Sequence, residues 1–113
     1  MPDGESRFET REDATNMVEF IKGQAPIGIS APIDVGRLMF FCLPANWDPG
    51  WHPAPRRQFA VIQAGAMHVE TSDGKRFRVG SGEAMMIEDT SGKGHRTTVP
   101  EGECTGVVIT IPD

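Results

Sequence analysis

The sequence predicts an all-β protein, and three observations support this. The chain has 113 residues, of which 13 are Gly and 9 are Pro, and these turn-forming residues separate short apolar runs. Several runs alternate apolar and polar residues, which is the period of a half-buried strand. No segment shows convincing helical periodicity. Eight or more short strands in one domain of this size are typical of a sandwich or a jelly roll.

The N-terminal part of the chain is less regular than the rest. Residues 1–12 are expected to form an arm, either flexible or strand-exchanging, and residues 13–23 a strand or an irregular segment. A strand is expected at 27–30. The continuous apolar run at 36–43 favours a strand that is buried on both faces.

The remainder of the chain reads as antiparallel strands joined by tight turns. Pro44 to Pro55 is a long loop with four prolines and one glycine, which should be rigid and extended. Asp73-Gly74 is typical of a two-residue hairpin turn. The expected strands are residues 58–63, 66–71, 75–79, 84–88, 95–99 and 105–111.

Composition and charge exclude several classes of protein. A formal net charge of −5 argues against nucleic acid as a partner, because phosphate binding requires clustered positive charge. No apolar run approaches the roughly 20 residues of a membrane-spanning helix. The polar, acidic first residues do not resemble a signal peptide. We therefore expect a single domain, residues 1–113, in the cytoplasm, where Cys42 and Cys104 are two buried, reduced thiols.

Two histidines define the candidate site. In an extended chain alternate side chains share a face. Between residues 52 and 62 one such face is polar at its first end and apolar at the other. This is typical of a barrel interior with a ligand site in its mouth. If the strands that follow are neighbours in one barrel, His52 and His95 should meet there. The shared face consists of His52, Ala54, Arg56, Gln58, Ala60 and Ile62.

The segment around His52 resembles the first motif of the cupin family. That motif is His-x-His, three or four spacers, Glu, six spacers and Gly. His52, Gln58 and Gly65 take the first His, the Glu and the Gly positions with both spacings kept, while Ala54 stands where the second His belongs.

The second cupin motif is matched further along the chain. A Gly-Asp turn, a strand, a loop and a His correspond to Gly82-Glu83, residues 84–88 and His95. The loop before His95 is longer than in the usual pattern, and Glu88 stands where Pro is common. With its WHPAPRRQ segment and its EDTSGKGH loop, the chain is similar over its whole length to a small single-domain cupin of a bacterial type.

The resemblance implies a double-stranded β-helix, that is, a cupin jelly-roll barrel. Such barrels are frequently dimeric and hold a divalent metal in the mouth through three His and one Glu. A set of His52, Gln58 and His95 has no anionic ligand, so Mg²⁺, Ca²⁺ and the iron of oxygenases are poor candidates. We expect either no cofactor or a weakly bound Zn²⁺, Ni²⁺ or Cu²⁺, unless Glu88 or Asp89 moves in.

The residues suggest small-molecule chemistry in the barrel. His52 and His95 could serve as general base and acid, and Arg56 could steady an oxyanion or a substrate carboxylate. Arg56 could instead form a buried pair with Glu88 or Asp89, and Trp51 could be a packing anchor or a lid. His68 is expected to face solvent and is assigned no function.

The reaction that these groups suit is isomerase- or lyase-type chemistry on a small polar ligand. Two alternatives are a non-enzymatic ligand-binding or sensor module and a metal-dependent dioxygenase. We expect a homodimer, because exposed edge strands of small barrels are commonly paired, and we expect neither nucleic acid nor a membrane as a partner.

Overall fold

The computed structural model describes residues 15–112, which form nine strands and no helix. The all-β prediction is confirmed, whereas the arm expected at residues 1–12 lies outside the described residues. No helix within residues 15–112 is long and apolar enough to cross a membrane. The strands are β1 (Thr15–Val18), β2 (Ile27–Ser30), β3 (Leu38–Leu43), β4 (Gln58–Ala64), β5 (Ala66–Thr71), β6 (Arg76–Gly80), β7 (Ala84–Ile87), β8 (His95–Thr98) and β9 (Cys104–Thr110).

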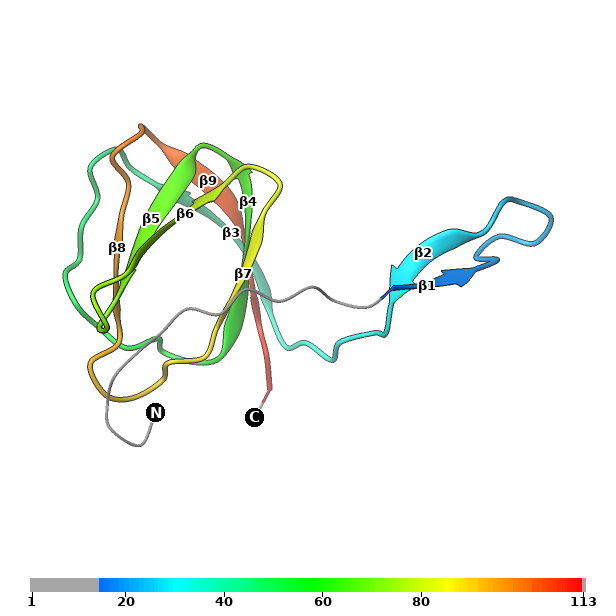
Figure 1. The fold of residues 1–113 in the computed structure, drawn as a ribbon, viewed down its shortest axis with the longest axis horizontal. Helices are drawn as coiled ribbons and strands as arrows, with labels where there is room; N and C mark the ends of the chain where they lie inside the picture. Colours follow the sequence, from blue (N-terminus) through cyan, green and yellow to red (C-terminus); the bar gives the residue numbers. More distant parts are fainter. Residues whose placement is uncertain (1–14, 113) are drawn as a thin grey trace.

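Two antiparallel sheets curve around one interior (Figure 1). The larger sheet has the strand order β3-β9-β4-β7 and the smaller one the order β6-β5-β8. β1 and β2 pair only with each other, as a separate two-stranded hairpin that projects away from the barrel (Figure 1).

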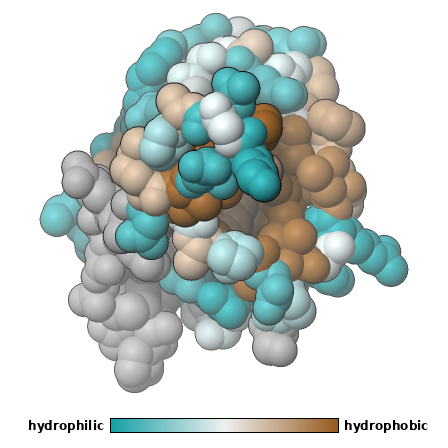
Figure 2. Space-filling model, turned by 90° about the vertical axis from the view of Figure 1, so that its right-hand side faces the viewer, coloured by the Kyte–Doolittle hydropathy of each residue, from teal (hydrophilic) through white to brown (hydrophobic). Residues whose placement is uncertain are grey.

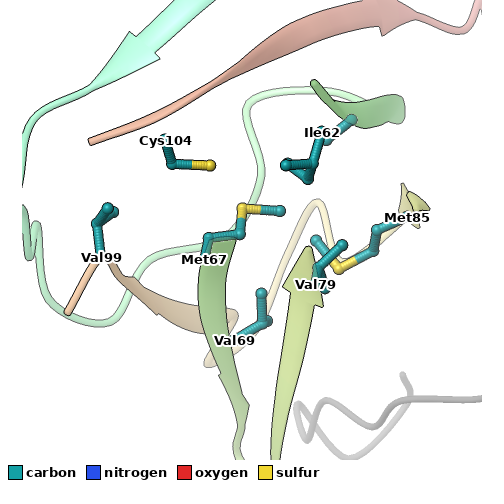
Figure 3. Packing of buried hydrophobic residues seen from close by; sticks show 8 residues of the cluster. Ile62, Met67, Val69, Val79, Met85, Val99 and Cys104 are labelled. Carbon is teal, nitrogen blue, oxygen red and sulfur yellow. The ribbon is translucent and has the colours of Figure 1, made fainter. Parts of the chain in front are cut away.

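The core lies between the two sheets and follows from the two-residue period of the strands. Ile62 and Met85 face it from the larger sheet, and Met67 and Val69 from the smaller one (Figure 3). Each of these four side chains is buried, and Ile62 is only 1% exposed. Alternation of apolar residues in the sequence therefore positioned the interior of the barrel correctly.

Glycines form the tight turns that the sequence predicts. Gly74 has φ 88°, and its amide donates to the Thr71 carbonyl at 3.0 Å, which closes the hairpin between β5 and β6. Gly65 has φ 79° between β4 and β5, and a Cβ there would lie 2.3 Å from the carbonyl oxygen of Glu103. A larger residue at position 65 would push β4 away from the start of β9.

Two burial predictions are wrong. The strand expected to be buried on both faces is β3, but it is an edge strand of the larger sheet, and its Leu38, Met39 and Phe40 are exposed. Cys104 is buried as predicted, whereas Cys42 is exposed, and both are free thiols. Leu38, Phe40 and Cys42 share the outer row of β3, on which no described part of the chain packs, whereas Met39 is on the opposite row with Phe41 and Leu43.

Candidate functional site

The structure brings the two histidines together. The backbone amide of His52 donates to the carbonyl of His95, and the amide of His95 donates to the carbonyl of His52, both at 3.0 Å. The ring centroids lie 5.0 Å apart, with the planes tilted by 52°. His95 is buried and begins β8, on the same alternate row as the buried Thr97.

Gly94 makes this close pairing possible. Its φ is 72°, and a Cβ on it would lie 2.1 Å from the carbonyl oxygen of His52. Any side chain at this position would therefore separate the two strands that carry His52 and His95. The geometry of the site therefore requires glycine at position 94, the second glycine of the GKGH sequence.

Each imidazole is held through its Nδ1 atom. His95 Nδ1 lies 2.7 Å from Asp89 Oδ2, and His52 Nδ1 lies 3.0 Å from the Gly50 carbonyl oxygen. Because the carboxylate and the carbonyl both accept, Nδ1 carries the proton in the neutral tautomer and Nε2 is the basic nitrogen. Among residues 15–112 neither Nε2 has a hydrogen-bond partner.

The sequence reasoning did not recognise Asp89 as the partner of His95. Backbone pairing positions this residue, because the amide of Ala54 donates to the Asp89 carbonyl at 2.9 Å. Asp89 also continues the inward row of β7 that contains Met85 and Ile87. That alternation, carried two residues past the strand, is the signal that could have identified it.

Of three further residues assigned to the site, Arg56 and Glu88 lie outside the interior, and Gln58 lies on the inward row. Arg56 is exposed, because the chain bends at residues 55–56 and the alternation from His52 does not continue through the bend. Glu88 is exposed on the opposite row from Asp89 and pairs with Arg57 at 3.1 Å. Gln58 is half-buried at the start of β4, opposite Ile87 and on the inward row.

A surface hollow of about 350 Å³ lies on the segments that carry the two histidines. Its described lining residues are Trp51, Ser72 and Lys93. Trp51 precedes His52 in the chain, and Ser72 follows Thr71, which is the strand partner of His95. Because neighbouring side chains of an extended chain point to opposite faces, the hollow lies next to these segments, and neither histidine is among its described lining residues.

The described residues do not match the metal-ligand set that the resemblance implies. The four positions hold His52, Ala54, Gln58 and His95, so they supply two imidazoles and no carboxylate. Asp89 contacts Nδ1 of His95 on the side away from its Nε2. Within residues 15–112 no group of three His, Cys, Asp or Glu side chains is arranged to hold a metal ion. We therefore derive no step through a metal.

The third histidine belongs to an ionic cluster on the outer face of the smaller sheet. His68 Nε2 lies 2.6 Å from Glu101 Oε2, and Arg78 Nε donates to the same oxygen at 2.8 Å. Arg78 first and His68 second lower the pKa of Glu101 to about 2. The sequence correctly placed His68 on the face away from the core.

Comparison with known proteins identifies the fold. No family model and no curated protein matches the chain. A cupin superfamily protein from Desulfitobacterium hafniense is 15% identical, with 94% of this chain and 84% of that chain covered and a TM-score of 0.56. A cupin domain from Bordetella pertussis is 17% identical, with 93% and 100% covered and a TM-score of 0.54.

A third solved structure is a conserved protein of unknown function from Streptococcus pyogenes. It is 20% identical, with 75% of this chain and 71% of that chain covered and a TM-score of 0.53. These similarities show that the chain has the all-β cupin jelly-roll fold. At such identities the similarity establishes the fold and leaves the activity to be argued from the site.

Proposed function

We propose that this chain is a small-molecule-binding cupin whose barrel transfers protons through His52 and His95, in isomerase- or lyase-type chemistry. The observation that supports the proposal is the paired imidazoles with both Nδ1 atoms engaged and both Nε2 atoms without a partner among residues 15–112. Two imidazoles at this separation, each with one ring nitrogen held and the other available, suit a general base and a general acid.

The contacts give the two imidazoles different roles. Asp89 accepts from His95 Nδ1 and fixes the orientation of its ring, so that Nε2 is the atom that exchanges a proton with a ligand, and we assign His95 as the acid. His52, which donates to a neutral carbonyl, is the base. The base takes a proton from a carbon next to a carbonyl, the electron pair forms an enolate, and the acid returns a proton elsewhere on the same molecule or to a leaving group.

The substrate class follows from the surroundings of the pair. Trp51 and Lys93 line the hollow on the segments next to the two histidines. An aromatic face and an ammonium group suit a small organic acid or a phosphorylated or carboxylated carbonyl compound. Arg56 is exposed, so the proposal assigns no step to it.

Hydrogen–deuterium exchange tests the proposal directly. The full chain, purified without a histidine tag and treated with chelator, is incubated in D₂O with a panel of small 2-oxo acids, hydroxy acids and aldose phosphates, and ¹H NMR follows exchange at carbon. We expect exchange in at least one compound class. His52→Ala or His95→Ala should reduce its rate by about 10²–10⁴-fold, the usual contribution of one acid or base.

His68→Ala is the matched control, because this histidine lies on the outer face, and it should exchange at the wild-type rate. Exchange that persists in both His52→Ala and His95→Ala would contradict the proposal. A ligand-induced rise in melting temperature without exchange would favour the non-enzymatic binding module. Exchange or oxidation that requires added Zn²⁺, Ni²⁺, Cu²⁺ or Fe²⁺ would favour a metal-dependent enzyme.

A further inference from the structure

The connection from β3 to β4 runs beside β8 (Figure 1). The amide of Asn46 donates to the carbonyl of Val99 at 2.8 Å, just beyond the end of β8. At the other end of this stretch the backbones of His52 and His95 pair with each other. Residues 47–51 are therefore held next to β8 on both sides.

An ion pair ties the middle of this stretch to the same strand. Arg96 follows His95 in β8, and its Nε donates to Asp48 Oδ1 at 3.1 Å while a terminal nitrogen donates to Oδ2. Two bonds between a guanidinium and a carboxylate fix the orientation of both groups. Arg96 first and the Gly50 amide second lower the pKa of Asp48, so this carboxyl is ionised at neutral pH.

Asp48 in turn fixes the peptide groups of Gly50. The Gly50 amide donates to Asp48 Oδ1 at 3.0 Å, and the Gly50 carbonyl oxygen lies 3.0 Å from His52 Nδ1. Gly50 has φ 82°, and a Cβ on it would have no heavy atom of the described residues within 4 Å. Hydrogen bonds rather than packing therefore direct its carbonyl towards the imidazole.

We propose that Arg96 and Asp48 are positioning residues for His52, an inference that rests on the proposed function of His52 as the base. The contacts run from the Arg96 guanidinium to the Asp48 carboxylate, then to the Gly50 amide and, through the Gly50 carbonyl, to His52 Nδ1. The bond that one ring nitrogen makes decides which nitrogen carries the proton. The ion pair therefore keeps the proton on Nδ1 and leaves Nε2 as the nitrogen that accepts.

The two imidazoles of the site are thus held by carboxylates in two different ways. Asp89 contacts His95 Nδ1 directly at 2.7 Å. Asp48 acts on His52 only through Gly50, and its own oxygens are bound by a guanidinium and an amide. The relay fixes the ring of the base without a charged group in contact with it.

The exposure of the ion pair separates this role from a purely structural one. The Arg96 and Asp48 side chains are 37% and 35% exposed, and ion pairs at such exposure contribute little to stability. Glu70 lies 3.9 Å from Arg96, too far for a hydrogen bond, so Asp48 is the main partner. Loss of the pair should therefore change the His52 ring more than the stability of the fold.

The ion pair is also remote from the apolar surface of the molecule. It lies at β8, on the opposite side of the barrel from the β1–β2 hairpin (Figure 1). Figure 2 views the molecule from the hairpin side and shows hydrophobic side chains gathered around the hairpin and on the barrel behind it. Substitutions at Arg96 or Asp48 leave that surface unchanged.

NMR of the ¹⁵N-labelled full chain measures the tautomer of His52 without a substrate. Long-range ¹H–¹⁵N correlation is recorded at a pH at which the rings are neutral, and the spectrum of His52→Ala assigns the signals. We expect the wild-type ring to carry its proton on Nδ1. Asp48→Ala should lower the ratio of the Nδ1–H to the Nε2–H tautomer by about 3- to 10-fold, the effect of losing one net hydrogen bond. Arg96→Gln should lower it less, because the Gly50 amide keeps its acceptor.

Arg78→Gln is the matched control, because it breaks the two-bond pair with Glu101 on the outer face of the same sheet and should leave the His52 ratio unchanged. Urea unfolding checks that each variant folds, and Arg96→Gln tests the same link if Asp48→Ala does not. A wild-type ring protonated on Nε2 would overturn the inference. A wild-type ratio in every folded variant of the pair would do the same, even with reduced stability.

Deuterium exchange separates this inference from the proposed function. If the wild type catalyses exchange, both variants should slow it by a factor similar to the change in tautomer ratio, through kcat rather than KM. Exchange at the wild-type rate in a variant with a shifted ratio would overturn the positioning role. No exchange by the wild type would count against the proposed function alone, and the tautomer ratio would still decide whether the ion pair positions the ring.

Discussion

At the scale of single residues, the ionic cluster on the outer face of the smaller sheet has a defined pH dependence. Glu101 accepts from Arg78 and contacts His68, and its pKa falls from about 4.5 to about 2. A carboxyl with a lowered pKa contributes stability that is complete above its unfolded pKa and is lost as the pH falls through its folded pKa. The Glu101 contribution is therefore present above about pH 4.5 and disappears between about pH 4.5 and 2.

We predict that Glu101→Gln flattens the acid limb of the stability profile. Its free energy of unfolding should be lower than that of the wild type at neutral pH, and the difference should shrink between pH 4.5 and 2. Urea titrations at several pH values measure this directly. Arg78→Gln should reproduce the change, because Arg78 is the main cause of the lowered pKa. A wild-type acid limb in both variants would contradict the prediction.

Single residues also show why the site could be predicted only in part. Spacing placed His52 and His95 in one site because both lie in or beside strands with a regular two-residue period. The same reasoning failed for Arg56, because it carried the alternation through a bend at residues 55–56. Asp89 was overlooked because it lies two residues beyond β7, where the inward row of Met85 and Ile87 continues past the end of the predicted strand.

At the scale of elements, the pairing of β8 with the segment before β4 depends on Gly94. Its φ of 72° is strained for any other residue, and a Cβ would lie 2.1 Å from the His52 carbonyl oxygen. Gly74 provides a matched comparison, since its φ is 88° and a Cβ on it would have no heavy atom within 4 Å. The two glycines share the conformational requirement and differ in the close approach.

We predict that Gly94→Ala is more destabilising than Gly74→Ala. The left-handed conformation should cost each variant about 1–2 kcal/mol. Gly94→Ala should lose a further ~1–3 kcal/mol because the neighbouring backbone must shift. Denaturant unfolding compares the two, and NMR of the ring protons reports whether His52 and His95 remain paired. Equal losses in the two variants would show that the close approach does not limit stability.

The positions of the strands could be predicted from the sequence, but the burial of each strand's two faces could not. Alternating residues identified β4 and β5 closely, because one face of each packs on the core and the other meets solvent. The run at β3 was predicted to be buried on both faces, and the structure leaves Leu38, Met39 and Phe40 exposed. An apolar run indicates that a strand avoids water. It carries no information on whether the same chain or another copy excludes that water.

At the scale of the whole molecule, the shape is extended for a chain of this length. The radius of gyration is 15.9 Å and the longest extent is 51 Å, whereas a compact domain of about 100 residues has a radius of about 13 Å. The difference reflects the projecting hairpin (Figure 1). Small domains have little stability to spare, so a large exposed apolar surface on one of them suggests that the stable unit is the assembly.

We predict that the melting temperature rises with protein concentration. If the folded unit is the homodimer expected from the sequence, a tenfold increase in concentration adds about 1.4 kcal/mol to its stability. For a cooperative unit of this combined size, that should raise the midpoint by about 3–5 °C. Phe40→Glu places a charge on the exposed face of the edge strand β3 and should therefore be monomeric. It should melt at a lower temperature, and its midpoint should not depend on concentration, because a monomer unfolds without dissociating. Scanning calorimetry over a hundredfold concentration range makes the comparison. A wild-type midpoint that stays constant across the range would mean that the barrel is stable alone and that its apolar face tolerates water.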